Sequence, residues 1–271
     1  KTTLAWVLSE GLSYYPRVSK ILVVDNDGQC NLTDTLIKEK SSKDESRKLN
    51  ILNCYKGKSV LDNILETGID KIHLLAGGEQ INDLDVKVSG MEKILDPFIS
   101  GEHKGFYDYI IIDNGPASGP LQRGSLAISD LIIAPFTTDA YCFDALMKMQ
   151  KSLEGFSKWN SVRIVPNMVR KTATSFAYLN SARKLWNAKV TKTEIPHGQE
   201  FHVAKELNKS IYMKRMGSGK TWLLLVDLLA ELFDIEPYEI TKAIAEAKTN
   251  KRKEIAKANF STRYTRKENE K

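Results

Sequence analysis

The chain has 271 residues, of which 42% are hydrophobic, and a formal net charge of +6. These values are ordinary for a globular protein with one sizeable domain or two small ones. No apolar run approaches the roughly 20 residues that a membrane-spanning helix needs, which excludes membrane insertion through such a helix. Cys30, Cys54 and Cys142 form no Cys-x-x-Cys pair. Their scatter argues against an iron–sulfur carrier and favours a reducing, cytoplasmic location.

Helical and extended patterns alternate along the chain. The continuous branched apolar run at 21–24 is typical of a strand buried on both faces of a parallel sheet. Strands separated by helices of ten or more residues indicate right-handed crossovers. We therefore expect an α/β fold, a doubly wound and mostly parallel sheet with helices on both faces. The expected elements are a helix over 4–12, strand 21–24, a polar loop at 38–46, helix 59–66, strand 71–75, helix 85–100, strand 107–113, strand 131–135, helix 143–155, strand 162–166, helix 175–187, strand 189–194 and a helix from 220.

Acidic residues follow two of the expected strands. The motif Asp-x-Asp-x-Gln-x-Asn at 25–31 follows the first strand, and Asp113 ends another. Ligands of such sheets bind beyond the carboxyl ends of the strands, where these groups would lie. The chain begins Lys1-Thr2-Thr3, followed by helical apolar spacing, which is typical of the last part of a phosphate-binding loop. Taken singly, each feature also fits a helix cap or a turn.

In this order the three features resemble the ParA-type ATPases, the deviant P-loop group that includes MinD-like members. In that family a loop reading Lys-Gly-Gly-x-x-Gly-Lys-Thr-Thr precedes Asp-x-Asp-Pro-Gln-x-Asn and a strand ending Asp-x-Pro-Pro. Residues 1–3 match the end of the loop. Residues 25–31 and 113–116 match the other motifs, with Gly28 and Gly115 at positions where proline is usual. The resemblance covers residues 1 to about 233 and implies a P-loop-type ATPase domain over 1–235.

The resemblance also implies an Mg²⁺-dependent ATP hydrolase with two catalytic residues. Lys1 would stabilise charge on the transferring phosphoryl group, and Asp27 would orient the attacking water. Thr2 would bind Mg²⁺, and Asp113 would hold the water shell of the metal ion.

Further nucleotide contacts are implied by the same resemblance. Lys1, Thr2 and Thr3 would meet the phosphates. Pro196, in Ile-Pro-His where the family has Ile-Pro-Arg, would lie against the adenine together with Asn167. His197 in place of arginine weakens any role carried over to that position.

The preceding strand, the glycines and the signature lysine of the family loop do not occur before Lys1. Backbone N–H groups of such a loop surround the phosphates. We therefore expect an N-terminally truncated sequence whose parent has about ten to twenty more residues, enough for one strand and one loop. The chain without them is expected to be impaired in ATP binding, and the ATPase assignment is for the parent.

By resemblance, the expected function is partition of plasmid or chromosomal DNA. The parent would form an ATP-bound homodimer, bind DNA without sequence preference and act with a ParB-type centromere-binding protein. Two alternatives remain at this stage. One is a MinD-like or other cargo-positioning ATPase that acts on a membrane or protein scaffold. The other is a non-catalytic scaffold of the same fold.

Basic residues suggest two surfaces for DNA. Lys214, Arg215 and Lys220 form a local basic patch beside Gly217-Ser218-Gly219-Lys220-Thr221, which imitates a P-loop but is better explained as the start of a helix. We also expect a basic helical tail over 236–271. Its part from 242 to 271 has ten Lys and Arg against four Glu, a net charge of +6. A charge run of this kind is usually a solvated helix, and it is also the electrostatic footprint of nucleic-acid binding.

Overall fold

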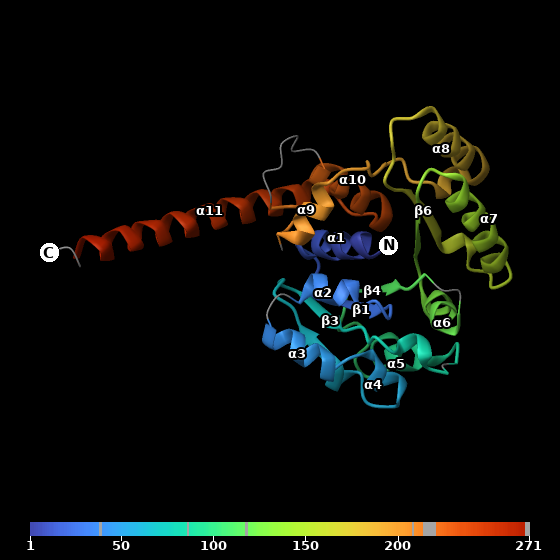
Figure 1. Cartoon of the computed structure of the whole chain (residues 1–271), viewed down its shortest axis with the longest axis horizontal. Coiled ribbons are helices and arrows are strands. Elements are labelled where there is room, and N and C mark those ends of the chain that lie inside the picture. The colour runs from blue at the N-terminus through green and yellow to red at the C-terminus, as the bar shows by residue number, and fades with distance from the viewer. Residues whose placement is uncertain (38–39, 86, 117–118, 208, 214–220, 269–271) are drawn as a thin grey trace.

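The computed structural model describes residues 1–37, 40–85, 87–116, 119–207, 209–213 and 221–268, with the backbone alone described at 40–42 and 255–268. Figure 1 shows a body of strands and helices from which one long helix projects. The helices are α1 (Thr2–Ser13), α2 (Asn31–Leu36), α3 (Lys40–Lys48), α4 (Ile51–Tyr55), α5 (Gly90–Ile99), α6 (Pro120–Ile128), α7 (Ala140–Glu154), α8 (Ala173–Trp186), α9 (Glu200–Glu206), α10 (Thr221–Phe233) and α11 (Pro237–Glu268). The strands are β1 (Ile21–Asn26), β2 (Ile64–Glu66), β3 (Ile72–Leu75), β4 (Tyr109–Asn114), β5 (Ile132–Phe136) and β6 (Val162–Pro166). Short 3₁₀ segments are η1 (Leu61–Asn63), η2 (Ile81–Asp83), η3 (Trp159–Ser161) and η4 (Asn187–Lys189).

The strands form two sheets. One has the order β2-β3-β1-β4, with β1 parallel to β3 and to β4, and the other pairs β5 with β6 in parallel. Only β2 runs antiparallel, against β3, among the strand pairs described. This confirms the expected α/β class with a mostly parallel sheet.

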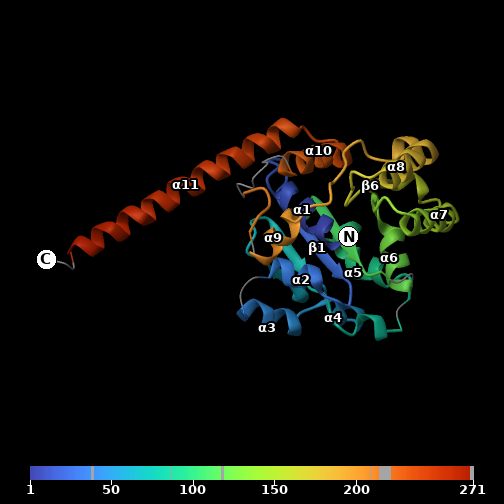
Figure 2. The same cartoon turned by 45° about the horizontal axis from the view of Figure 1, so that its top comes forward.

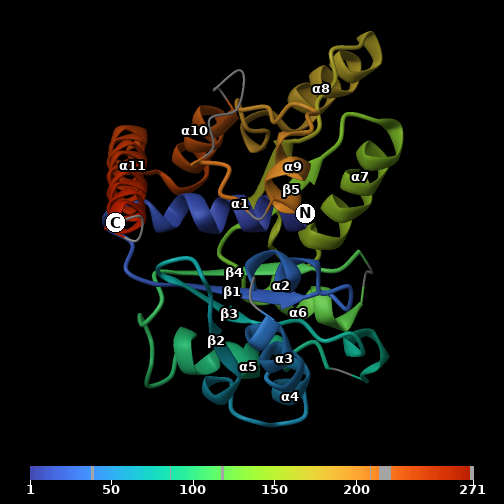
Figure 3. The same ribbon diagram turned by 60° about the vertical axis from the view of Figure 1, so that its left-hand side comes forward.

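Helices cover both faces of the larger sheet, as Figure 3 shows. Ile21 and Val23 of β1 pack with α1 and α10 on one face. Leu22 and Val24 pack with α4 and α5 on the other. All four side chains are buried, as expected for a strand whose successive residues point to opposite covered faces.

Strand β4 is less buried than its sequence suggests. Its apolar residues Tyr109 to Ile112 are half-buried, whereas every residue of β1 is buried. β4 pairs with β1 along one edge, and no second strand neighbour is described for it. An edge strand is covered less completely than a central one.

Three expected elements are wrong in detail. The polar loop expected at 38–46 is, from Lys40, the helix α3. This helix is largely exposed, so its sequence does not need an apolar face. Arg47 pairs with Asp44, three residues earlier, at 3.3 Å. The helix expected at 59–66 is instead η1 followed by the edge strand β2. The strand expected at 189–194 is a single bridge between Ile164 and Val190.

The tail forms one continuous helix, α11. Figures 1 and 2 show that it packs beside α10 near its start and then extends away from the body. Ile240 and Ile244 are fully buried and hold its first turns against the core. No helix among the described residues is long and apolar enough to cross a membrane.

Candidate active site

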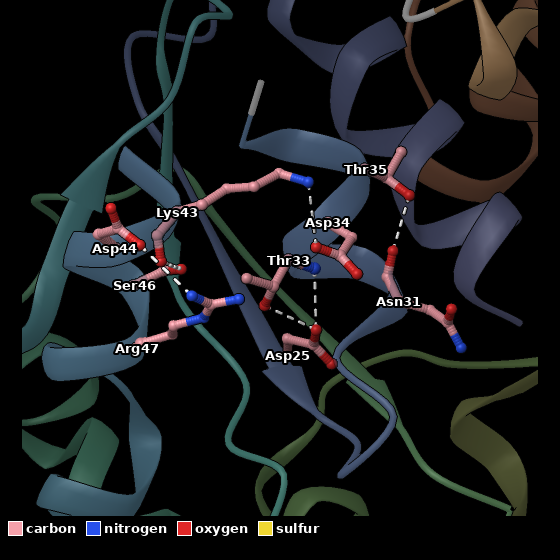
Figure 4. A network of polar contacts seen from close by, with 9 residues as sticks. All are labelled: Asp25, Asn31, Thr33, Asp34, Thr35, Lys43, Asp44, Ser46 and Arg47. Atoms are coloured by element: carbon pink, nitrogen blue, oxygen red, sulfur yellow. Dashed lines mark hydrogen bonds and ion pairs between the residues drawn. The ribbon is translucent and has the colours of Figure 1, made fainter. Parts of the chain in front are cut away.

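Asp25 ties the end of β1 to the helix that follows. It is fully buried, and one carboxylate oxygen accepts hydrogen bonds from Thr33 N at 2.9 Å and Thr33 Oγ1 at 2.8 Å, drawn in Figure 4. Thr33 Oγ1 in turn accepts from Gly77 N at 2.8 Å. Burial raises the pKa of Asp25 to about 6, against the lowering effect of the Thr33 hydrogen bonds. Asp25 therefore joins β1, α2 and the segment after β3.

Asp27 lies at the rim of the same sheet edge. Its Oδ1 accepts a hydrogen bond from Gln29 N at 3.0 Å, which fixes the turn after β1. Gly115 approaches it closely, since a Cβ at that glycine would come 3.2 Å from Asp27 Oδ1. Asp27 is 9% exposed, whereas Asp25 is fully buried.

Asp113 is the buried acid of β4 and is linked to the start of α1. The side chain of Thr2 donates a hydrogen bond to it. Burial raises the pKa of Asp113, and the Thr2 hydrogen bond and the positive charge of Lys1 oppose that rise. Its Oδ2 is buried and has no hydrogen-bond partner in the part of the chain that the structure describes. A buried oxygen in that state can accept a hydrogen bond from a water molecule or bind an ion.

These residues converge at one place. In the parallel register of β1 and β4, Asp25 lies opposite Asp113, so both strands deliver their acids to the same edge. Lys1 Nζ donates to the Gly115 carbonyl at 2.8 Å, which brings the start of α1 over the segment after β4. The structure thus brings Lys1, Thr2, Asp27 and Asp113 together at one edge of the sheet.

The other predicted nucleotide contacts lie in separate segments. Thr3 is exposed on the first turn of α1. Asn167 follows β6, and its backbone N–H donates to the Phe136 carbonyl at 2.8 Å. Pro196 pairs with Val169 in an isolated parallel bridge, which places it beside the segment that Asn167 begins.

The basic patch of Lys214, Arg215 and Lys220, like most of the P-loop imitation at 217–221, lies outside the described residues.

An asparagine network supports the two acids, and sequence reasoning missed it. Asn26 Nδ2 donates to Asn114 Oδ1 at 2.9 Å and to Ser125 Oγ at 3.2 Å. The Tyr55 hydroxyl donates to Asn26 Oδ1 at 3.2 Å. The signal available in the sequence was the repeated Asp-Asn pair, since each acid-ended strand continues with asparagine. The network holds the ends of β1 and β4 in register.

The fold is of the P-loop NTPase type. The septum site-determining protein MinD of Pyrococcus horikoshii OT3, solved with Mg-ADP, superposes with a TM-score of 0.67 at 17% identity, over 86% of this chain and 90% of that one. At this identity the likeness concerns the fold.

The sequence comparisons are more specific. The AAA_31 family, described as "AAA domain", matches residues 1–164. Sporulation initiation inhibitor protein Soj of Bacillus subtilis (strain 168) is 26% identical over 228 residues, 79% of this chain and 85% of Soj. The virulence plasmid ParA family protein pGP5-D of Chlamydia trachomatis is 25% identical over 202 residues, 72% of this chain and 75% of that protein. The chain belongs to this AAA-domain family, and it is similar in sequence to Soj and to a plasmid ParA family protein.

Proposed function

We propose that the protein is an ATP-dependent partition ATPase. In this proposal it forms an ATP-bound homodimer, binds DNA without sequence preference and segregates plasmid or chromosomal DNA together with a ParB-type centromere-binding protein. The observation that carries the ATPase part is the meeting of Lys1, Thr2, Asp27 and Asp113 at one sheet edge. The name of pGP5-D, a plasmid ParA family protein, supports the DNA part.

The Thr2–Asp113 pair fits a magnesium ion with its water shell. Mg²⁺ prefers oxygen ligands and keeps several waters, and it is held through one or two carboxylates together with substrate phosphates. The Thr2 hydroxyl and the unpartnered Asp113 Oδ2 supply oxygens of that kind at the end of β4. A magnesium ion bound there would neutralise charge on the phosphates of ATP. Asp113 holds the Thr2 hydroxyl in place and offers its free oxygen to the water shell.

Lys1 and the first turn of α1 fit the phosphates. The first N–H groups of a helix have no partner within the helix and favour an anion. The Lys1 ammonium lies at the same point, where it donates to the Gly115 carbonyl. A bound phosphate would replace the Gly115 carbonyl as the acceptor of the Lys1 ammonium. A hydrogen bond to a charged acceptor is the stronger of the two. Thr3 on the same turn completes this contact.

Asp27 fits the role of a positioning group for water. One oxygen is occupied by Gln29 N, which fixes the carboxylate. The other would accept a hydrogen bond from an attacking water. Phosphoryl transfer depends mainly on positioning and charge, so a strong base is not required. We assign the adenine to Asn167 and Pro196, which lie in neighbouring segments after β6.

The test of the ATPase proposal is turnover in the full-length protein, with any residues encoded upstream of Lys1 included. Asp27→Ala is expected to lower kcat about a hundredfold or more while ATP still binds, since the nucleotide contacts stay and only the positioned water is lost. Asp62→Ala, at an exposed acid within η1, is the matched control and should turn over ATP normally. Equal turnover in wild type and Asp27→Ala would refute the role of Asp27. A wild type without turnover would favour the non-catalytic scaffold.

A second candidate is a MinD-like positioning ATPase that acts on a membrane or protein scaffold. The fold likeness to the septum site-determining protein supports it. Co-sedimentation separates the two, with ATP present and either random-sequence duplex DNA or anionic phospholipid vesicles as the probe. ATP-dependent sedimentation with DNA supports partition. Sedimentation with vesicles and not with DNA supports the alternative.

A further inference from the structure

The side-chain amide of Asn26 connects four elements at the end of β1. Asn26 is 2% exposed. Its Nδ2 donates to Asn114 Oδ1 of β4 at 2.9 Å and to Ser125 Oγ of α6 at 3.2 Å. Its Oδ1 accepts from the Tyr55 hydroxyl of α4 at 3.2 Å. One side chain thus joins both acid-bearing strands to α4 and α6, which pack against the same hydrophobic cluster on one face of the sheet.

The orientation of this amide is determined by its neighbours. Ser125 Oγ donates its own proton to the Leu121 carbonyl at 3.2 Å, so it can only accept from Asn26. The Leu121 carbonyl lies 3.4 Å from Asn26 Nδ2 and is also an acceptor. Nδ2 must therefore face α6, which leaves Oδ1 for Tyr55. Asn26 uses both N–H donors and the carbonyl acceptor of its amide, whereas an ionised aspartate has no donor and a leucine has no polar group.

Asn26 also fixes the peptide that lies beside Asp27. The main-chain carbonyl of Asn26 accepts a hydrogen bond from Gly115 N at 3.4 Å, one residue beyond the Asn26–Asn114 pair of β1 and β4. The Gly115 backbone lies against Asp27, since a Cβ there would come 3.2 Å from Asp27 Oδ1. Asp27 is thus held by Asn26 on its own strand and by Gly115 on the neighbouring strand. The hydrogen bond between the Asn26 and Asn114 side chains keeps these two supports together.

We propose that Asn26 is a positioning residue for ATP hydrolysis. Its amide holds the ends of β1 and β4 at the spacing in which Asp27 orients the attacking water, and Tyr55 and Ser125 hold the amide. This inference rests on the proposed function for the reaction and on the hydrogen bonds of Asn26 for the role. Asn26 acts through Asp27 and needs no contact with ATP. A misplacement of about 1 Å in a positioning group can cost about a hundredfold in rate.

The loss of this amide should affect turnover and not nucleotide binding. When ATP binds, Lys1 exchanges the Gly115 carbonyl for a phosphate oxygen, so the phosphate contact does not use the peptide that Asn26 holds. Asp113 lies within the ladder of β1 and β4, where main-chain pairing holds it. The orientation of the water, in contrast, depends on the exact place of Asp27. A general loss of stability would not separate the two effects in this way.

The test is the kcat for ATP of the full-length protein, per folded molecule, together with its affinity for a non-hydrolysable ATP analogue. Asn26→Leu replaces the amide with an apolar side chain of similar shape. It should lower kcat at least about tenfold and leave the analogue affinity within about twofold of the wild type.

A milder variant tests the support from α4. Tyr55→Phe removes only the hydroxyl that donates to Asn26, and it should lower kcat about threefold. In the Asn26→Leu background the same change should have no further effect, because the hydroxyl acts through the amide. If Asn26→Leu does not fold, Tyr55→Phe decides. A lower kcat with unchanged analogue affinity supports the inference, and a wild-type kcat overturns it.

The matched control is a second buried amide pair, in η1 beside the edge strand β2 and two strands away from β1. Asn63 is 1% exposed, accepts from Asn53 Nδ2 at 2.7 Å and donates to the Ser59 carbonyl at 2.8 Å. Asn63→Leu should keep the wild-type kcat. Amide exchange at Gly115, measured without ATP, should be faster in Asn26→Leu and unchanged in Asn63→Leu.

Several results would overturn the inference and leave the proposed function in place. One is an unchanged kcat in Asn26→Leu, and another is an equal fall in Asn63→Leu, which would mean a general loss of stability. A fall in analogue affinity as large as the fall in kcat would mean that the amide serves binding. A wild type that does not turn over ATP overturns both the inference and the proposed function.

Discussion

The charge on Asp25 opposes folding at neutral pH, and Asp25→Asn tests this. The carboxylate is fully buried, and its pKa is raised from 3.8 to about 6. Each tenfold change in an acid dissociation constant corresponds to about 1.4 kcal/mol, so ionisation within the fold destabilises it by about 3 kcal/mol. In the asparagine, the side-chain carbonyl oxygen can accept both hydrogen bonds from Thr33. The side-chain NH2 group takes the place of the oxygen that accepts from Asp27 N at 3.3 Å, so that hydrogen bond is lost. Losing that weak bond costs about 1 kcal/mol. We expect a net gain of about 2 kcal/mol at pH 8.

The pH dependence has a defined sign. An acid whose pKa is raised by folding binds its proton more tightly in the folded state. Its contribution to stability is therefore present below about pH 4 and is lost as the pH rises to about 6, with no further change above that value. The neutral asparagine has no such loss. The variant should gain over wild type at pH 8 and lose that gain at pH 4.

Urea unfolding at pH 4, 6 and 8, without nucleotide or magnesium, measures the difference in the free energy of unfolding between the variant and the wild type. Asp62→Asn, an exposed acid, is the control and should track the wild type at every pH. If Asp25→Asn is less stable than wild type at pH 8, the Thr33 hydrogen bonds need the charged acceptor, and burial does not dominate the energetics of Asp25.

Three packing and capping predictions concern the scaffold, each measured by urea unfolding. Gly11→Ala should destabilise by about 2 kcal/mol, because a Cβ there would overlap the Tyr212 hydroxyl and Leu229; no change would mean that this contact can relax. Asn50→Ala should cost about 1 kcal/mol, since its side chain caps the first turn of α4; a cost near zero would show that water replaces the cap. Ile240→Ala should cost about 3 kcal/mol and loosen α11, seen as faster amide exchange in its first turns; wild-type exchange there would show that α11 does not depend on this anchor.

The placement of the acids at one sheet edge was predictable because two local rules act together. A continuous apolar run such as 21–24 marks a buried parallel strand, and parallel strands present their carboxyl ends at one edge. Asp25, Asp27 and Asp113 could therefore be placed at the same edge without knowing any distance. The distinction between Asp25 and Asp27 could not be foreseen. Both follow the same strand, and only the fold shows that Thr33 encloses the first while the second stays at the rim.

The three wrong predictions concern segments at the surface of the molecule or at the edge of a sheet. Segments 38–46 and 59–66 carry no complete apolar face, so their hydrophobic pattern indicates little about their structure. In the structure α3 carries the exposed ion pair Arg47–Asp44, and β2 pairs with β3. These contacts involve a helix with little burial and an edge strand, where periodicity is weakest. The expected strand at 189–194 lies at the edge of the smaller sheet and keeps only the bridge at Val190.

The most direct test of the central claim is magnesium-dependent binding of a non-hydrolysable ATP analogue to the full-length protein, measured by calorimetry. If Thr2 and Asp113 hold the metal ion against the phosphates, Mg²⁺ should tighten binding at least about tenfold in the wild type and have little effect in Asp113→Asn. The affinity without Mg²⁺ should be similar in both. An equal effect of Mg²⁺ in the two proteins would contradict the account, because the metal ion would then bind without the acid at the end of β4.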